Sequence, residues 1–222
     1  MLLRSIERND LPACIALLKR IWDFSGFSHP MGEEATAAWY LHHHLQSSTH
    51  AFVLELNGLV VGYLLGTIPG DRTFDSKPEW KCIGHQVEDT WQAVTTAEER
   101  QTFLNEWFYG GTWAEEVLKR KAISKDASVW IQLFIVDPEV QGQGLGSRLW
   151  KAFEEVRIKR ASEQWVLLHT DTWCGFQFYE RRGLVRLATC PVKELPIDAN
   201  GVQPAYFLYG LRPTCLRVSW GF

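Results

Sequence analysis

The sequence has few of the features that mark metal-binding, nucleic-acid-binding or membrane proteins. Its five cysteines are scattered and form no C-x-x-C pair, which leaves zinc or redox chemistry unsupported and favours free thiols in a reducing cytoplasm. Acidic residues (26) outnumber Lys and Arg (23), so no broad basic surface is available to attract nucleic acid. No long apolar run is present near the start, so neither a signal peptide nor a membrane span is expected.

Internal repeats and low-complexity linkers are also missing. The 222 residues are enough for one well-filled core, so we expect a single domain over residues 1–222 with an inserted helical segment at about 66–125. Tryptophan, by contrast, is abundant, with eleven residues. So much aromatic area indicates a large core or a hydrophobic binding cleft.

Alternating apolar patterns and turn residues predict a mixed α+β order along the chain. A strand at 2–6 precedes a helix that Asn9-Asp10 begins and that carries Pro12 in its first turn. A second helix covers 32–47. Asn57-Gly58 between two apolar runs predicts a hairpin. The other expected strands are 130–136, 165–171, 185–191 and 205–211, with a polar loop at 192–203 that contains Asn200-Gly201.

The segment from Gly66 to Lys125 begins as a loop and then becomes helical. Two capping boxes, Thr96 with Glu99 and Thr112 with Glu115, predict two helices separated by Gly110-Gly111. The aromatic residues of this segment must pack on the main body, on another subunit, or over the active site as a lid. Packing on the main body is the interpretation we favour. The residues concerned are Phe74, Trp80, Trp91, Phe103, Trp107, Phe108, Tyr109 and Trp113.

The most informative stretch is 130–147, WIQLFIVDPEVQGQGLGS. A strand that passes through a glycine-rich turn into a helix directs several backbone N–H groups at one point, which suits a phosphate. A mononucleotide loop is excluded because Ser147-Arg148, not Lys-Ser/Thr, follows Gly146. The dinucleotide pattern G-x-G-x-x-G fits poorly, since the glycines are spaced G-x-G-x-G. The pattern Q/R-x-x-G-x-G/A fits, and an ordinary strand–turn–helix corner is the remaining explanation.

A second motif favours the third pattern. Residues 165–185 predict a strand and then a short helix with Phe178-Tyr179-Glu180, which Gly183 ends. Together the two motifs resemble the GNAT superfamily of acyl-CoA-dependent N-acyltransferases, closely over about 128–190 and loosely outside it. The segment 66–125 departs from the family, in which the hairpin usually leads quickly into the cofactor-binding strand.

The resemblance implies an α+β fold with a mixed, mostly antiparallel sheet, flanked by helices, whose two central parallel strands splay apart. It implies acetyl-CoA as co-substrate and no metal. The pantetheine arm would take up the free backbone groups of the splayed strand, and the diphosphate would lie on the glycine-rich loop. The residues expected to bind it are Phe134, Ile135, Val136, Gln141, Gly142, Gln143, Gly144, Leu145, Gly146, Ser147 and Thr172.

For catalysis, the resemblance assigns Tyr179 to the leaving sulfur, since a neutral phenol can donate a proton. The base that the family often uses does not carry over, because Ser128 stands near its position. His169 and Asp171 share a face of one strand and are the candidates, with a water relay as an equal alternative. The His42-His43-His44 run is interpreted as surface or packing, because consecutive helical residues point in different directions.

The expected function is therefore transfer of an acetyl group to a primary amine of a small molecule or peptide by direct attack. Aromatic residues of the expected acceptor groove favour an aromatic or hydrophobic amine, or a peptide end. The alternatives are a non-catalytic acyl-CoA-binding or sensing module and an unrelated enzyme such as a small dehydrogenase. Whether the chain forms a homodimer stays open. The groove residues are Trp22, Phe24, Phe27, Trp39 and Tyr40.

Overall fold

The computed structural model describes residues 1–193, 195–197 and 201–213. A seven-stranded mixed sheet lies at the centre of this part of the molecule. All neighbouring strands are antiparallel except β4 and β5, which are parallel. The expected mixed, mostly antiparallel sheet is thus confirmed. The strand order is β1-β2-β3-β4-β5-β7-β6. The strands are β1 Leu2–Ser5, β2 His50–Leu56, β3 Leu59–Thr67, β4 Val129–Val136, β5 Val166–Asp171, β6 Val185–Pro191 and β7 Ala205–Leu211.

The turn between β2 and β3 follows from two residues. Asn57 and Gly58 both have positive φ, 53° and 81°, as the tight turn of a two-residue hairpin requires. Asn tolerates this left-handed region better than most residues, and Gly adopts it without steric cost. The hairpin predicted from Asn-Gly is confirmed: it pairs β3 with β2, and the other edge of β3 pairs with β4.

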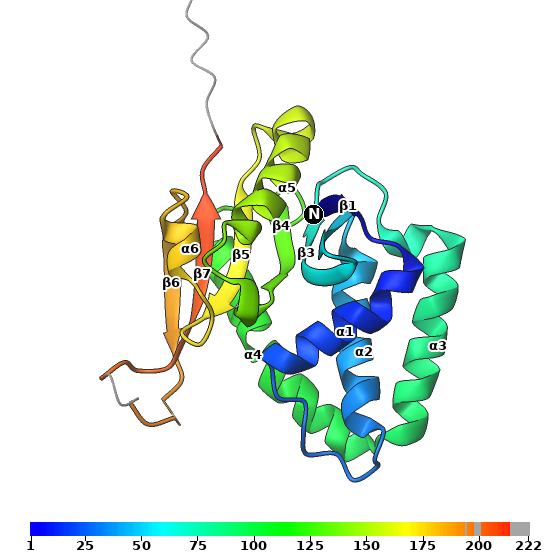
Figure 1. Cartoon of the computed structure of the whole chain (residues 1–222). Helices are drawn as coiled ribbons and strands as arrows, with labels where there is room; N and C mark the ends of the chain where they lie inside the picture. Colours follow the sequence, from blue (N-terminus) through cyan, green and yellow to red (C-terminus); the bar gives the residue numbers. More distant parts are fainter. Residues whose placement is uncertain (194, 198–200, 214–222) are drawn as a thin grey trace, which may run out of the picture.

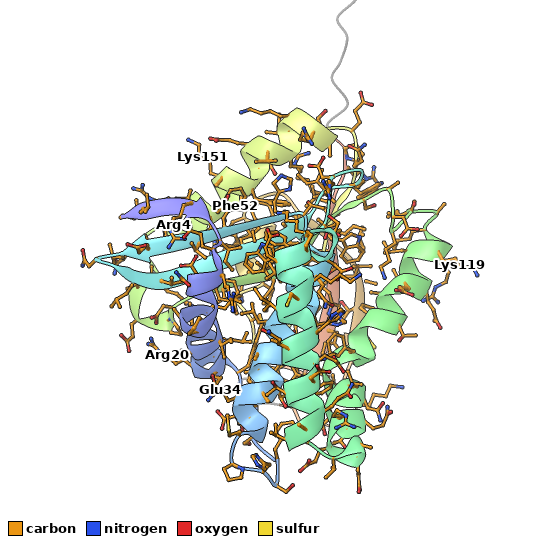
Figure 2. All side chains as sticks on the ribbon, turned by 90° about the vertical axis from the view of Figure 1, so that its right-hand side faces the viewer. Arg4, Arg20, Glu34, Phe52, Lys119 and Lys151 are labelled. Carbon is orange, nitrogen blue, oxygen red and sulfur yellow. The ribbon has the colours of Figure 1, made fainter. Side chains whose placement is uncertain are left out.

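Helices cover both faces of the sheet (Figures 1 and 2). Helix α5, Leu145–Ala161, packs on one face and buries Leu149 and Phe153. On the other face lie α1, Leu11–Ile21, and α2, Gly32–Ser47. Two apolar clusters result, one on each side of β3 and β4. Because successive strand residues point to opposite faces, Leu64 belongs to the α5 side while Tyr63 and Leu65 belong to the α1–α2 side.

Two long helices connect β3 to β4, and their boundary differs from the prediction. Helix α3 is Pro78–Val94 and begins at a proline in its first turn. Helix α4, Ala97–Arg120, begins at the predicted Thr96–Glu99 capping box, in which Thr96 Oγ1 accepts from Glu99 N at 3.1 Å and Thr96 N donates to Glu99 Oε2 at 2.7 Å. The predicted break at Gly110-Gly111 and the second capping box at Thr112 are wrong.

The reason that α4 continues through two glycines lies in its flanks. Each helical glycine costs about 1 kcal/mol relative to alanine. On the N-terminal side Phe103 packs into the α1–α2 cluster, and on the C-terminal side Val117 and Leu118 pack with Leu167 and Leu208 of the sheet. Burial of several large apolar side chains on both sides exceeds this penalty.

The described aromatic residues of α3 and α4 pack on the main body, as we favoured from the sequence, and several of them contact α2. Trp91 stacks on Trp39 with ring centroids 4.2 Å apart, and its Nε1 donates to Thr36 Oγ1 at 2.9 Å. Gly84 of α3 leaves room for His42, because a Cβ there would lie 2.2 Å from His42 Nε2. The histidine run is therefore partly a packing feature of this helix pair.

The remaining elements are short. They are η1 Arg8–Asp10, η2 Phe74–Ser76, η3 Pro138–Val140 and α6 Gln177–Glu180. Among the described residues, none of the helices has the length and apolar character needed to cross a membrane. Asn200 of the expected polar loop, the side chain of Tyr109, and Cys215, Trp220 and Phe222 lie outside the part of the chain that the structure describes.

Candidate active site

The two parallel strands part halfway along their length. Pairing between β4 and β5 runs only from Val129–Val166 to Ile131–Leu168. Beyond this point β4 stays paired with β3 up to Val136, and β5 stays paired with β7 up to Asp171. Within the described residues, the second half of β4 thus has no strand on its β5 side. Sequence reasoning placed the opening at this same stretch.

A bulge sets which backbone groups of β4 face the opening. The register with β3 skips Gln132, so the strand carries one extra residue there. Beyond it, Asp137 N donates to Val61 O at 2.9 Å, which directs the backbone groups of Asp137 and Ile135 towards β3. The alternate residues, Phe134 and Val136, therefore direct their N–H and C=O groups into the opening.

The glycine-rich loop follows immediately from this strand. Gly142 and Gly144 have φ values of 81° and 75°, a left-handed conformation that side chains disfavour. The first helical hydrogen bond of α5 comes from Arg148 N to Gly144 O, at 3.3 Å. The preceding N–H groups lie at the positive end of a 17-residue helix and are available to an anion. Gln141 Nε2 donates to Val136 O at 3.1 Å and so fixes the loop to the strand end.

Steric conditions differ among the loop glycines. A Cβ on Gly142 or Gly144 would meet no atom within 4 Å, whereas one on Gly146 would lie 3.3 Å from the Phe178 ring. Gly142, Gln143 and Gly144 are exposed, whereas the side chain of Leu145 is buried in the apolar cluster between α5 and the sheet. Only the backbone of Leu145 is therefore left to act as a ligand.

An arginine adds positive charge to this helix end. Arg182 Nη2 donates to Ser147 Oγ at 2.6 Å, and the guanidinium lies 3.3 Å from the centre of the Phe178 ring. Two further arginines are exposed: Arg148, which follows Ser147, and Arg181, which precedes Arg182. Among the described residues, no carboxylate forms an ion pair with any of these three arginines. Sequence reasoning missed Arg182, although it lies within the second motif.

Tyr179 lies beside the open strand edge. Its ring centroid is 6.4 Å from that of Phe134 on β4 and 6.2 Å from that of Trp150 on α5. Burial raises the pKa of Tyr179 well above that of a free phenol, and the charges of Cys174 and Asp171 raise it further. The phenol is therefore protonated at neutral pH. Its hydroxyl has no hydrogen-bond partner within the described part of the chain, so it is free to donate to a substrate.

The neighbour of Tyr179 anchors this short helix. Glu180 Oε1 accepts from Tyr209 Oη at 2.6 Å and from Arg186 Nη2 at 2.8 Å. Burial raises the pKa of Tyr209 to about 12, and the bond to Glu180 contributes in the same direction. These contacts hold α6 against strands β6 and β7. Because Tyr179 lies on α6, they also fix the orientation of Tyr179.

Asp171 ends β5 and starts a tight turn. Its Oδ1 accepts from Trp173 N at 2.8 Å and from Cys174 N at 2.9 Å. Burial raises the pKa of Asp171, although these hydrogen bonds oppose the shift. Burial and the adjacent carboxylate raise the pKa of Cys174 to about 12, so that thiol stays neutral and is a poor nucleophile. Burial raises the pKa of Tyr40 on α2, and the charges of Cys174 and Asp171 raise it further.

The other sequence candidates occupy different surroundings. His169 stacks on Tyr206 with ring centroids 5.5 Å apart, and its buried Nε2 has no hydrogen-bond partner among the residues that the structure describes. Burial lowers the pKa of His169 to about 4, so the imidazole is neutral at pH 7. Thr172 bridges to β7, since its N donates to Ala205 O at 3.0 Å and its Oγ1 accepts from Ala205 N at 3.2 Å. No group of three or more His, Cys, Asp or Glu within the described residues could hold a metal.

Four aromatic residues from three segments of the chain pack together and form what we call the aromatic wall: Trp22, Phe24, Tyr40 and Trp107. The Trp22 ring lies nearly perpendicular to Tyr40 and to Trp107, with centroids 5.9 and 6.0 Å apart. Phe24 stacks on Trp107 at 4.5 Å. Trp22, Tyr40 and Trp107 are only partly buried, so part of each side chain is exposed to solvent. Trp107 belongs to α4, and sequence reasoning placed it only generally within the inserted segment.

The buried histidines predict acid-sensitive stability. Burial lowers the pKa of His169 to about 4 and of His44 to about 3, against about 6.5 in the unfolded chain. The unfolded state then binds more protons below pH 6.5, so stability is present above that pH and is lost as pH falls towards 4. Each group contributes at most about 1.4 kcal/mol per pH unit. We expect the thermal midpoint to fall between pH 6.5 and 4.5, and less steeply in His169→Gln. Identical slopes in both proteins would contradict the assignment.

Comparison with known proteins agrees with this geometry. Residues 107–185 match the model of the acetyltransferase (GNAT) domain. The Escherichia coli ribosomal-protein-S18-alanine N-acetyltransferase superposes with a TM-score of 0.54 at 15% identity, covering 100% of this chain and 99% of the other. The Drosophila melanogaster polyamine N-acetyltransferase gives 0.58 at 18% identity, covering 95% and 99%. An agmatine N-acetyltransferase gives 0.57 at 15%, covering 95% and 98%. No curated protein sequence matches the chain.

The splayed sheet and the loop that opens α5 belong to a fold that the chain shares with these N-acetyltransferase structures. Over residues 107–185 the chain is similar to the acetyltransferase (GNAT) domain, and its fold as a whole is that of these N-acetyltransferase structures. Both sequence motifs that predicted a GNAT domain overlap the matched residues, so the match agrees with that prediction.

Proposed function

We propose that the protein transfers an acetyl group from acetyl-CoA to a primary amine of a small molecule by direct attack. The observation that supports this most is the continuity of β4 with its loop. Phe134 directs its N–H and C=O groups into the opening, and Val136 directs its N–H there, while Val136 O accepts from Gln141 Nε2. Five residues after Val136 the amides of Gln141–Ser147 begin. The pantetheine arm of acetyl-CoA, which contains amide groups, would lie along the open edge of β4. The diphosphate would lie on the amides of the loop.

The chemistry then needs few groups from the protein. The neutral amine nitrogen forms a bond to the thioester carbonyl carbon, and the C–S bond breaks as the electron pair leaves on sulfur. Tyr179 donates its phenolic proton to that sulfur, and its hydroxyl is free to do so. A backbone N–H of the open edge, at Val136, stabilises the negative charge that builds on the carbonyl oxygen.

Asp171 is the better of the two candidate bases. Burial raises the pKa of Asp171, which makes its carboxylate a stronger base than an exposed aspartate. A negative charge near the amine also attracts the ammonium form of the substrate. His169, with a pKa of about 4, is too weak a base to hold the proton, although its free Nε2 can accept a hydrogen bond from a relaying water.

The acceptor class rests on this chain's own residues, because the similar structures include enzymes for a protein alanine and for polyamines. The aromatic wall has partly exposed side chains at Trp22, Tyr40 and Trp107, and the negative charge of Asp171 acts on Tyr40 of this wall. Aromatic rings bind both apolar groups and ammonium groups. We therefore propose a small amine with an aromatic or apolar body as the acceptor.

An assay of thiol release with purified protein and acetyl-CoA tests this function. The panel contains an arylalkylamine, a linear polyamine and a peptide with N-terminal alanine, with the N,N,N-trimethyl form of the arylalkylamine as matched control. We expect rapid release and a mass increase of one acetyl group with the arylalkylamine only. The trimethyl control cannot be acetylated, since its nitrogen has no free electron pair. Preference for the peptide would contradict the acceptor class, and no release with any amine would contradict the proposed activity.

A further inference from the structure

Arg20 forms a two-point ion pair with Asp137, the residue that directly follows β4. It lies in the last turn of α1 and is labelled in Figure 2. Its Nη1 donates to Asp137 Oδ2 at 2.9 Å, and its Nη2 donates to Asp137 Oδ1 at 3.0 Å. The same Nη2 lies 2.9 Å from Glu139 Oε1. The Asp137 side chain is only 9% exposed, so the pair is partly shielded from water.

Asp137 is in turn the point where the strand becomes the loop. Its N donates to Val61 O at 2.9 Å, and its Oδ1 accepts from Glu139 N at 3.0 Å. Val140 N then donates to Asp137 O at 3.1 Å, which closes the single turn η3. This turn leads directly into Gln141. One carboxylate therefore fixes both the end of the open strand and the start of the glycine-rich loop.

The ion pair also has an electrostatic consequence. Two carboxylates, Asp137 and Glu139, stand within four residues of a loop suited to a diphosphate, and their charge would repel that ligand. Arg20 holds both. It thus neutralises negative charge at the entrance to an anion site, and the helix that carries it leads straight to Trp22 of the aromatic wall.

We propose that Arg20 is a positioning residue for the cofactor loop, one that acts through Asp137 and couples α1, on the acceptor side, to the binding of acetyl-CoA. This inference rests on the proposed function. It assigns no contact between Arg20 and the substrates. Loss of the guanidinium weakens acetyl-CoA binding because the loop loses its anchor and two carboxylates lose their counterion.

The test compares three variants by steady-state kinetics and by calorimetry with acetyl-CoA. In Arg20→Gln we expect the KM for acetyl-CoA to rise about tenfold while kcat and the KM for the amine stay within about twofold. Arg20→Lys keeps the charge but not the paired geometry, so it restores part of the affinity. Arg4→Gln is the matched control, since Arg4 forms an equivalent pair with the buried Asp10, at 2.6 and 2.8 Å, away from the loop.

The outcomes separate the two proposals. A purely structural role of Arg20 would lower the melting temperature of Arg20→Gln and Arg4→Gln alike and leave the KM for acetyl-CoA equal in both, which would overturn the inference. Absence of acetyl-CoA binding to the unmodified protein would instead overturn the proposed function itself. A selective rise in that KM for Arg20→Gln, with partial rescue by lysine, supports the coupling.

Discussion

Replacement of Gly144 by glutamate should reduce the affinity for acetyl-CoA about 100-fold or more. The Cβ of this residue would enter open space, so the fold has room for the side chain. The carboxylate, however, would stand at the start of α5, among the amides that we assign to the diphosphate. Like charges about 4 Å apart near a protein surface repel by about 4 kcal/mol. Calorimetric titration with acetyl-CoA measures the loss.

Gly144→Ala separates charge from backbone strain. The φ of 75° disfavours any side chain, and the strain costs about 1–2 kcal/mol of stability in either variant. Both proteins should therefore melt at similar temperatures, below that of the unmodified protein. We expect the alanine variant to keep most of its affinity, within about tenfold. Equal binding by the glutamate variant and the unmodified protein would remove the loop from the site.

The fold was predictable where local chemistry decides the structure. Asn57-Gly58 determines a hairpin through its two positive φ values, and Gly142 and Gly144 determine the loop in the same way. The capping box at Thr96 begins a helix because two hydrogen bonds satisfy its free amides. These signals depend only on residues a few positions apart, which a single sequence contains.

Long-range packing was the part that the sequence did not show. Gly110-Gly111 favours a break locally, yet α4 passes through it because each half of the helix packs on a different cluster. Arg20 and Asp137 are 117 positions apart, and nothing in either neighbourhood indicates that they meet. The bulge at Gln132 is likewise set by the register with β3.

The candidate site divides in the same way. The loop and Tyr179 follow from motifs, whereas the choice between His169 and Asp171 depended on their environments. The sequence places both on one face of β5. The structure lowers the pKa of the histidine by burial without any partner and raises that of the aspartate, and these opposite shifts distinguish a weak base from a stronger one.

Tyr179→Phe should lower kcat about 100-fold and leave the KM for acetyl-CoA nearly unchanged. The substitution removes one hydroxyl that has no hydrogen-bond partner in the described protein, so the ring contacts with Phe134 and Trp150 remain and stability changes little. Without a proton donor, the sulfur must leave as a bare thiolate, and general acids typically contribute about 100-fold or more. Steady-state kinetics with the best amine measures the effect.

Tyr63→Phe is the matched control for Tyr179→Phe. Tyr63 is fully buried on β3, where its hydroxyl donates to Cys14 O at 3.4 Å, on the α1–α2 side of the sheet. Loss of that hydroxyl should lower the melting temperature without a change in kcat. If Tyr179→Phe left thiol release unaffected, the phenol would have no part in the reaction and a water molecule would have to protonate the sulfur. If neither the unmodified protein nor either variant released thiol while all three bound acetyl-CoA, the chain would be a binding module, because cofactor affinity and turnover would then be separate properties of the same site.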